Sequence, residues 1–333
     1  MIFITGATGL LGSHLAKNLI AKGEQVTALK RSTSNLALLG EYANKITWIE
    51  GDLSNIDALN EATKNAEKVF HCAALISFLK KDRTALYKTN VEGTANVMNA
   101  ALENGVKKLV HVSSVAAFGF SKKGETISEK TVYDEEKGLA YYFKSKHFGE
   151  REAWRAQAEG LNVVIANPST ILGGGWWNVE PNNLFLQLKK KMPFYTQGSN
   201  GFVDVRDVAK ALEILMEKAE SGSQYIISAE NHSFKNLLSL IAETLQVPTP
   251  SIGLNYPLAK AAILYSSLSS LLLNKKPLLT NDKYLIANSN FKYNNQHFVQ
   301  DFSFQYIPIK ETIKSTCVLL NNSLQKGEKF GIL

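Results

Sequence analysis

The stretch Met1–Gly12, MIFITGATGLLG, decides the fold of this chain. Its residues Ile2–Ile4 form a short apolar run of β-forming types, which predicts a buried strand. From Leu10 onward the apolar residues recur at helical spacing, so a helix should follow. Between them stand evenly spaced glycines, Gly6, Gly9 and Gly12. Bare backbone N–H groups at a helix N-terminus bind phosphate, and side chains would hold it away. This order therefore indicates a dinucleotide-binding βαβ unit.

The bulk composition is that of a globular protein with room for one large or two modest domains. The 333 residues are 45% hydrophobic and 20% charged, with a net charge of +7. Lysines stand in scattered pairs, at 80–81, 107–108, 122–123 and 275–276, so we expect no nucleic-acid partner. Cys72 and Cys317 are too few for a disulfide framework or a metal cluster, and we expect buried free thiols and no metal. The N-terminus has no cationic leader pattern, so the predicted location is cytoplasmic.

Strands and helices alternate through the first half of the chain. We expect further strands at Gln25–Lys30, Ile46–Glu50, Lys68–Ala73, Lys108–Ser113 and Asn162–Asn167. Helices are expected at Leu11–Lys22, around residues 56–62, at Thr84–Asn104 and at Tyr141–Gly160, with a looser segment at Gly119–Gly138. This alternation predicts an α/β fold with a Rossmann-type doubly wound parallel sheet, whose ligand lies beyond the carboxyl ends of the strands.

After about residue 170 the alternation fades. Helices are expected near Asn183–Lys191, Arg206–Ala219 and Phe234–Leu245, followed by an apolar helix at Ala259–Leu273. The apolar helix is short and holds four serines, so we expect no integral membrane span, while peripheral membrane contact stays open. We therefore predict a dinucleotide-binding domain at 1–170. A smaller, mainly helical C-terminal substrate lobe at 171–333 is expected to be partly interleaved with the sheet.

Two later motifs carry candidate chemistry. Tyr142 and Lys146 are four residues apart, which places both side chains on one face of a helix. A lysine ammonium group beside a phenol should lower the phenol pKa and make the tyrosine a proton donor and acceptor near neutral pH. Ser113 and Ser114 end the fifth strand, where a hydroxyl can donate a hydrogen bond to a developing alkoxide.

Together these motifs resemble the extended short-chain dehydrogenase/reductase family, within the NAD-dependent epimerase/dehydratase superfamily. The glycine spacing is G-x-x-G-x-x-G, with Thr5 and Ala7 beside it. Further matching segments are Gly51–Leu53, His71–Ala74, Asn90–Thr94, Asn167–Ser169 and Gly201–Val208, so the resemblance covers at least residues 1–215. Phe118-Gly119 stands where the family often has Tyr-Gly, which matches Ser114 to the catalytic Ser/Thr and leaves Ser113 as the fallback.

The resemblance implies an NAD(P)-binding domain with a Ser-Tyr-Lys site made of Ser114, Tyr142 and Lys146. It implies that the glycine turn binds the pyrophosphate through Gly6, Thr8, Gly9, Leu10, Leu11 and Gly12. It further implies that Asp52 and Leu53 hold the adenine and that Ala73 and Ala74 line the dinucleotide path. The remaining implied cofactor contacts are Asn90, Asn167, Pro168, Ser169, Tyr142 and Lys146, with Lys146 on the nicotinamide ribose.

The end of the second strand bears on the choice of cofactor. An NAD-preferring site places a carboxylate there to accept from the ribose hydroxyls. Here the sequence is Leu29-Lys30-Arg31-Ser32, with no carboxylate, and Lys30 and Arg31 are cations that would attract a 2′-phosphate. We therefore predict NADP(H) as the preferred cofactor. The alternative is NAD(H), and Arg31 would then be a solvated loop residue.

Several sequence features bear on which reaction of the family this chain catalyses. Dehydratases of the family typically have Asp-Glu after the catalytic Ser/Thr, whereas Val115-Ala116 stands there in this chain. The arginine that sugar-nucleotide epimerases usually have before the Phe-Val segment is missing ahead of Phe202. Asp204 replaces a frequent histidine, which leaves the substrate contacts there open.

Two features of the second half of the chain suggest an apolar substrate. An apolar pocket lining is expected from Trp176, Trp177, Leu184 and Phe185. The tail, with Tyr256-Pro257, Lys276–Thr280 and Phe304–Ile309, resembles the dihydroflavonol-reductase and hydroxysteroid-dehydrogenase branch.

We therefore predict an NADP(H)-dependent oxidoreductase that reduces a ketone or aldehyde of a fairly apolar small molecule, reversibly, by hydride transfer. A nucleotide-sugar epimerase that retains NAD is the first alternative. A non-catalytic NAD(P) sensor is the second, and the intact Ser-Tyr-Lys set argues against it. By analogy with the family, a homodimer through Thr84–Asn104 and Tyr141–Gly160 is expected.

Overall fold

The computed structural model describes residues 1–332 except 121–123, 135–139, 274–276 and 278. The lysine pairs at 122–123 and 275–276 lie outside the described residues. So do parts of two sequence features, the Gly119–Gly138 segment and the Lys276–Thr280 motif. All other elements named above fall within the described part of the chain.

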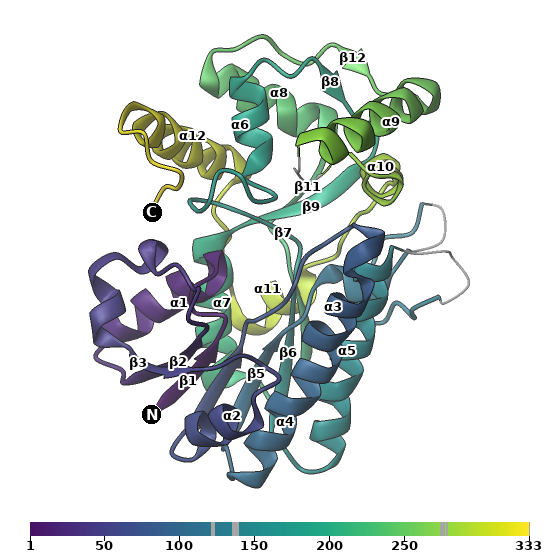
Figure 1. Ribbon diagram of the computed structural model, residues 1–333. Helices are drawn as coiled ribbons and strands as arrows, with labels where there is room; N and C mark the ends of the chain where they lie inside the picture. The colour runs from purple at the N-terminus through teal and green to yellow at the C-terminus, as the bar shows by residue number, and fades with distance from the viewer. Residues whose placement is uncertain (121–123, 135–139, 274–276, 278, 333) are drawn as a thin grey trace.

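A seven-stranded parallel sheet forms the centre of the molecule (Figure 1). Its spatial order is β10-β6-β5-β4-β1-β2-β3. The strands are β1 (Ile2–Thr5), β2 (Val26–Lys30), β3 (Thr47–Glu50), β4 (Lys68–His71), β5 (Lys108–Val112), β6 (Val163–Pro168) and β10 (Gln224–Ile227). The order reverses between β1 and β4, which is the place where sheets of this kind bind their ligand. The predicted doubly wound α/β fold is confirmed.

Helices cover both faces of this sheet (Figure 1). One layer holds α1 (Leu10–Ala21), α7 (Val205–Lys218) and α11 (Gln296–Phe302). The other holds α2 (Ile56–Thr63), α4 (Gly93–Glu103) and α5 (Tyr141–Ala158). Along β1, Ile4 packs toward the first layer and Phe3 toward the second. Burial on both faces explains why these strands are continuous apolar runs in the sequence.

The expected long helix at Thr84–Asn104 is built from three joined pieces. These are α3 (Arg83–Tyr87), a π-helical turn at Lys88–Glu92, and α4. A Cβ on Gly149 of α5 would lie 2.1 Å from the Asn90 carbonyl oxygen in that turn. The absence of a side chain at this position lets α5 approach the π-helical turn closely.

The seventh strand of the sheet, β10, was not predicted from the sequence. β10 is the four-residue run QYII and comes from the second half of the chain, between α7 and the upper lobe. It pairs in parallel with β6, with Gln224 opposite Ile165. A run this short carries no periodicity of its own, and its neighbour lies about sixty residues earlier in the chain.

The upper lobe combines helices with two small sheets (Figure 1). Its strands are β7 (Thr170–Leu172), β9 (Ser199–Asp204) and β11 (Glu230–Ser233) in one sheet, and β8 (Phe194–Tyr195) and β12 (Ile252–Gly253) in the other. Its helices are α6 (Asn183–Lys189), α8 (Phe234–Leu245), α9 (Tyr256–Leu273), α10 (Asn281–Asn288) and α12 (Ile309–Gln325). Among the described residues, no helix combines the length and the apolar character that a membrane crossing requires.

Two of the four residues expected to line an apolar pocket, Trp177 and Phe185, do not line one. Trp177 and Phe185 are buried in the core of the upper lobe, together with Leu237 of α8 and Ile313 of α12. Trp176 packs against Phe330 near the C-terminus. These aromatic residues therefore pack the interior of the upper lobe.

Candidate active site

The glycine turn is shaped by close backbone contacts. Gly6 has a φ of +73°, and a Cβ there would lie 2.7 Å from the Ala73 backbone nitrogen. A Cβ on Gly12 would lie 2.2 Å from the Gly6 carbonyl oxygen. Gly9 is the N-cap residue of α1 and provides no side-chain cap. The turn therefore presents the start of α1 with bare backbone donors, which is the arrangement that binds a phosphate.

Residues of β1 and β4 meet beside this turn. Thr5 Oγ1 lies 2.7 Å from His71 Nδ1 and accepts a hydrogen bond from the Ala73 N–H at 3.1 Å. Ala73 is thereby held next to Gly6, while the following Ala74 is exposed. In the turn itself Thr8 and Leu10 are half-buried and Leu11 is buried. The structure thus brings the predicted pyrophosphate contacts and Ala73 to one edge of the sheet.

A second group of predicted contacts lies at the ends of β2 and β3. The Lys30 ammonium group lies 5.9 Å from the centre of the Trp48 ring, and Arg31 is exposed. Asp52 accepts hydrogen bonds from the Ser54 N–H and hydroxyl at 2.8 and 2.6 Å. These hydrogen bonds lower the pKa of Asp52, and the positive charge of Arg31 lowers it further. Leu53, next in the chain, is buried.

Ser114 and Tyr142 come together from two elements. Ser114 caps the short 3-10 helix Val115–Phe118 by accepting a hydrogen bond from the Ala116 N–H at 3.1 Å. Burial raises the pKa of Tyr142 to about 12, and a hydrogen bond with the Ser114 side chain opposes the rise. The neighbouring Ser113 hydroxyl is buried, and within the described residues it has no partner. Ser114 is therefore the serine that the fold pairs with Tyr142.

Lys146 lies deeper, one helical turn along α5. It is buried, and its ammonium group donates a hydrogen bond to the Val112 carbonyl oxygen at 3.1 Å. Burial lowers the pKa of Lys146 to about 8. The expected lowering of the Tyr142 pKa by Lys146 is wrong for this structure, because the loss of hydration dominates at the phenol. Tyr142 is accordingly a protonated acid at neutral pH.

Aromatic side chains surround Tyr142. Phe78 meets its ring edge-on at a centroid distance of 5.5 Å, and Phe143 lies 6.3 Å away. Phe291 and Tyr293, from the segment after α10, belong to the same buried cluster. The apolar surroundings that the sequence placed in the Trp-Trp loop are therefore found here instead.

Among the remaining predicted cofactor contacts, Asn90 connects two parts of the fold, whereas Ser169 keeps a hydroxyl that is unused within the described part of the chain. The Asn90 side chain accepts from the Leu75 N–H at 2.7 Å and donates to the Leu75 carbonyl and the Ser145 hydroxyl, both at 2.9 Å. It thus fastens the loop after β4 to α5. Pro168 ends β6, and the hydroxyl of the next residue, Ser169, is buried without a partner among the described residues. Ser169 keeps a free polar atom at the strand end.

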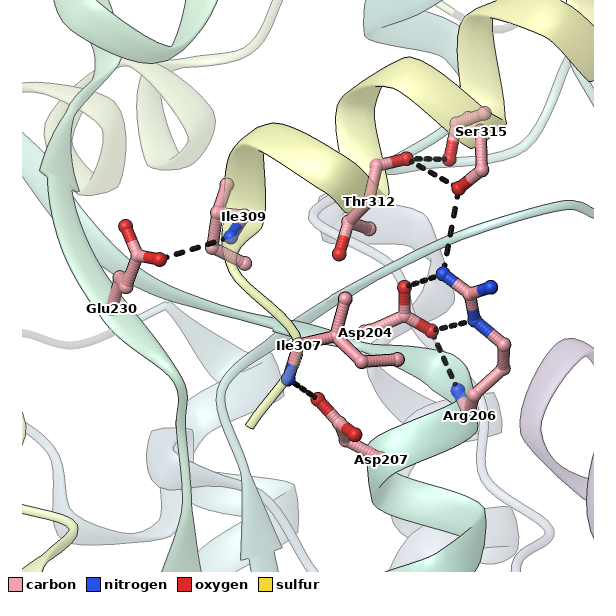
Figure 2. Close-up of polar contacts among 9 residues, drawn as sticks. Asp204, Arg206, Asp207, Glu230, Ile307, Ile309, Thr312 and Ser315 are labelled. Carbon is pink, nitrogen blue, oxygen red and sulfur yellow. Dashed lines mark hydrogen bonds and ion pairs between the residues drawn. The ribbon is translucent and has the colours of Figure 1, made fainter. Parts of the chain in front are cut away.

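Asp204, whose role the sequence left open, is a structural residue in this fold (Figure 2). Its buried carboxylate caps α7 by accepting from the Arg206 N–H at 2.8 Å. The same carboxylate accepts from Arg206 Nε at 2.9 Å and Nη2 at 2.6 Å. Nearby, Asp207 accepts from the Ile307 N–H at 2.7 Å, which ties the segment before α12 to α7.

Comparison with known proteins agrees with this geometry. Residues 2–228 match the family described as NAD dependent epimerase/dehydratase. The chain belongs to this family. It is an NAD(P)-dependent enzyme of the extended short-chain dehydrogenase/reductase type, in the branch that resembles dihydroflavonol reductases.

Three relatives show the range of the match. A protein of Synechocystis sp. named "Putative dihydroflavonol 4-reductase" is 35% identical over 256 residues, covering 74% of this chain and 73% of the relative. An anthocyanidin reductase of Arabidopsis thaliana is 28% identical over 270 residues, covering 72% and 79%. The crystal structure of gox2253 superposes with a TM-score of 0.83 at 28% identity, covering 98% of both chains. The reductase names among these relatives support oxidoreductase activity.

The residues present fit an NAD(P) group. The glycine turn is a cradle that a Cβ at Gly6 or Gly12 would close, and α1 begins there without a side-chain cap. The unpartnered Ser169 hydroxyl lies at the end of β6, on the same edge of the sheet. The chain thus offers a phosphate site at the glycine turn after β1, next to the place where the strand order reverses. It also offers a polar site near Tyr142 and Ser114.

Proposed function

We propose that this enzyme is an NADP(H)-dependent reductase of ketones or aldehydes on apolar small molecules, able to run in reverse as an alcohol dehydrogenase. The observation that carries the proposal is the hydrogen-bonded Ser114–Tyr142 pair inside an aromatic cluster. A protonated phenol with an apolar wall beside it suits an uncharged carbonyl compound. A sugar nucleotide would require cations for its diphosphate at this place.

The chain's residues then divide the work of carbonyl reduction. The bound cofactor supplies the hydride. Tyr142 donates its proton to the carbonyl oxygen as negative charge develops there, and the Ser114 hydroxyl holds that oxygen by donating a hydrogen bond to it. Lys146 supplies a buried positive charge one helical turn away. The aromatic cluster keeps bulk water from the reacting oxygen.

The preference for NADP(H) rests on the end of β2. Arg31 is exposed there and close enough to Asp52 to affect its pKa, and Lys30 extends over Trp48. A 2′-phosphate would meet an exposed guanidinium group in this place.

The decisive experiment follows NADPH oxidation with a panel of apolar ketones and aldehydes, using the parent chain and Tyr142→Phe. We expect Tyr142→Phe to lower turnover by about a hundredfold or more, because it removes the proton donor and leaves the ring in place. Its affinity for NADPH, measured by nicotinamide fluorescence, should change less than threefold. Full activity in the variant would refute the assignment of Tyr142.

The same preparation tests the epimerase alternative. A reductase releases and rebinds its cofactor at every turnover, so the purified protein should exchange added NADPH freely. A nicotinamide cofactor that copurifies and resists exchange, together with no net NADPH oxidation by any carbonyl compound, would contradict the reductase proposal.

A further inference from the structure

A closed ring of hydrogen bonds lies beneath the proposed site. Glu150 of α5 accepts from Asn167 Nδ2 at 2.7 Å and from Gln224 Nε2 at 2.8 Å. Gln224 Nε2 also donates to Asn167 Oδ1 at 3.0 Å, which closes the ring. The Asn167 amide has a further bond to the Ser114 carbonyl oxygen at 3.0 Å. One carboxylate therefore links α5, β6 and β10 to the loop that carries Ser114.

Glu150 also lies close to Lys146 and Tyr142 along α5. It lies four residues after Lys146 and eight after Tyr142, so the three side chains share one helix face. Glu150 and Lys146 are both buried. A buried carboxylate with two amide donors is held in one geometry, because each hydrogen bond comes from a different strand.

The other groups around the Lys146 ammonium are uncharged at neutral pH. From β4, burial lowers the pKa of His71 to about 3, and the pKa of the adjoining Cys72 is raised to about 12. From β5, burial lowers the pKa of His111 far below its usual value. From α5 itself, Tyr142 is a neutral phenol. Among the groups that act on Lys146 in the described part of the chain, Glu150 is thus the one that supplies compensating charge.

We propose that Glu150 is a positioning residue: it holds Lys146 as a buried cation and, through Asn167, fixes the Ser114 loop relative to Tyr142. The proposal rests on the function proposed above, but its first consequence is independent of it. A buried ammonium group that loses a compensating charge should release its proton at a lower pH.

The test measures the titration of Lys146 directly. The protein is labelled with 13C-lysine, and the Lys146 Cε resonance, assigned by its loss in Lys146→Met, is followed with pH. In the parent chain we expect a midpoint near 8, since burial lowers the pKa of this group to about that value. We expect Glu150→Gln to lower the midpoint by at least one pH unit, a tenfold change in proton affinity.

Two further variants separate charge from position. Glu152→Gln is the matched control on the same helix, because Glu152 is only partly buried and pairs with Arg155 at 2.8 Å; it should leave the midpoint unchanged. Glu150→Asp keeps the charge but is too short to reach both amides. It should leave the midpoint within about half a unit while lowering kcat for NADPH-dependent reduction, with little effect on NADPH affinity.

The outcomes distinguish this inference from the proposed function. A midpoint that is the same in Glu150→Gln and the parent overturns the role of Glu150, whatever the activity. A parent midpoint well below 7 overturns it as well, because Lys146 would then be uncharged at neutral pH; this measurement needs no variant to fold. A lowered midpoint in Glu150→Gln, without any reductase activity in the parent chain, would support the charge role of Glu150 and count against the proposed reaction.

Discussion

Asp204 allows the sharpest test of whether a site position serves the fold or the substrate. Its carboxylate is fully buried, caps α7 and forms an ion pair with Arg206, whose side chain is 40% exposed (Figure 2). Family resemblance alone places a substrate contact in this neighbourhood. The geometry instead predicts that substitutions at Asp204 lower stability and leave catalysis largely intact.

The magnitude for Asp204→Ala follows from two contacts. Loss of the N-cap costs about 1 kcal/mol. Loss of the ion pair costs about 0.5–1 kcal/mol, because the partly exposed arginine can return to water. The free energy of unfolding should therefore fall by about 2 kcal/mol, which for a chain of this size is a Tm decrease of about 3 °C. Asp204→Asn keeps the cap and should lose only about half as much.

Urea unfolding of Asp204→Ala, Asp204→Asn and Arg206→Ala, with kcat measured on the same preparations, checks this reasoning. The ordering expected is that Asp204→Asn lies between Asp204→Ala and the parent chain in stability. A variant with parental stability and kcat lowered more than tenfold would refute the structural role and place Asp204 at the substrate. Equal damage from Asn and Ala would show that the cap contributes nothing.

Two further predictions concern cofactor choice and pH. Arg31→Ala should raise the Kd for NADPH about tenfold, the effect of losing one charge-assisted hydrogen bond, with little change for NADH. Fluorescence titration with both cofactors measures this, and equal weakening of both would count against a 2′-phosphate contact. Burial raises the pKa of Asp207 to about 6 from an ordinary value of 3.8, so the folded state binds this proton more tightly than the unfolded chain does. The stability that the protonated carboxyl contributes is therefore present below pH 4 and is lost as the pH rises through 6. Relative to Asp207→Asn, which keeps an acceptor for the Ile307 N–H, the parent chain should therefore lose stability between pH 4 and pH 6 in urea unfolding, and parallel pH profiles would contradict this.

The sequence alone determined the parts of this protein that depend on local spacing. The glycine turn at Gly6–Gly12, the alternation of strands and helices, and the four-residue step from Tyr142 to Lys146 are all read within a few turns of chain. The doubly wound sheet follows from them, because right-handed crossovers leave few other arrangements. The end of the fifth predicted strand offered both Ser113 and Ser114, and the resemblance of Phe118-Gly119 to the family favoured Ser114.

Tertiary structure decided what depends on contacts between distant segments. Glu150 reaches Gln224 across 74 residues, and β10 is a strand only because β6 is there to pair with it. The prediction for the Tyr142 pKa had the wrong sign, because spacing shows a nearby charge but not the loss of water around a buried ring. Trp177 was expected in a pocket and lies in a core for a similar reason. An apolar residue in a loop signals burial, but only the packing of the whole chain determines what buries it.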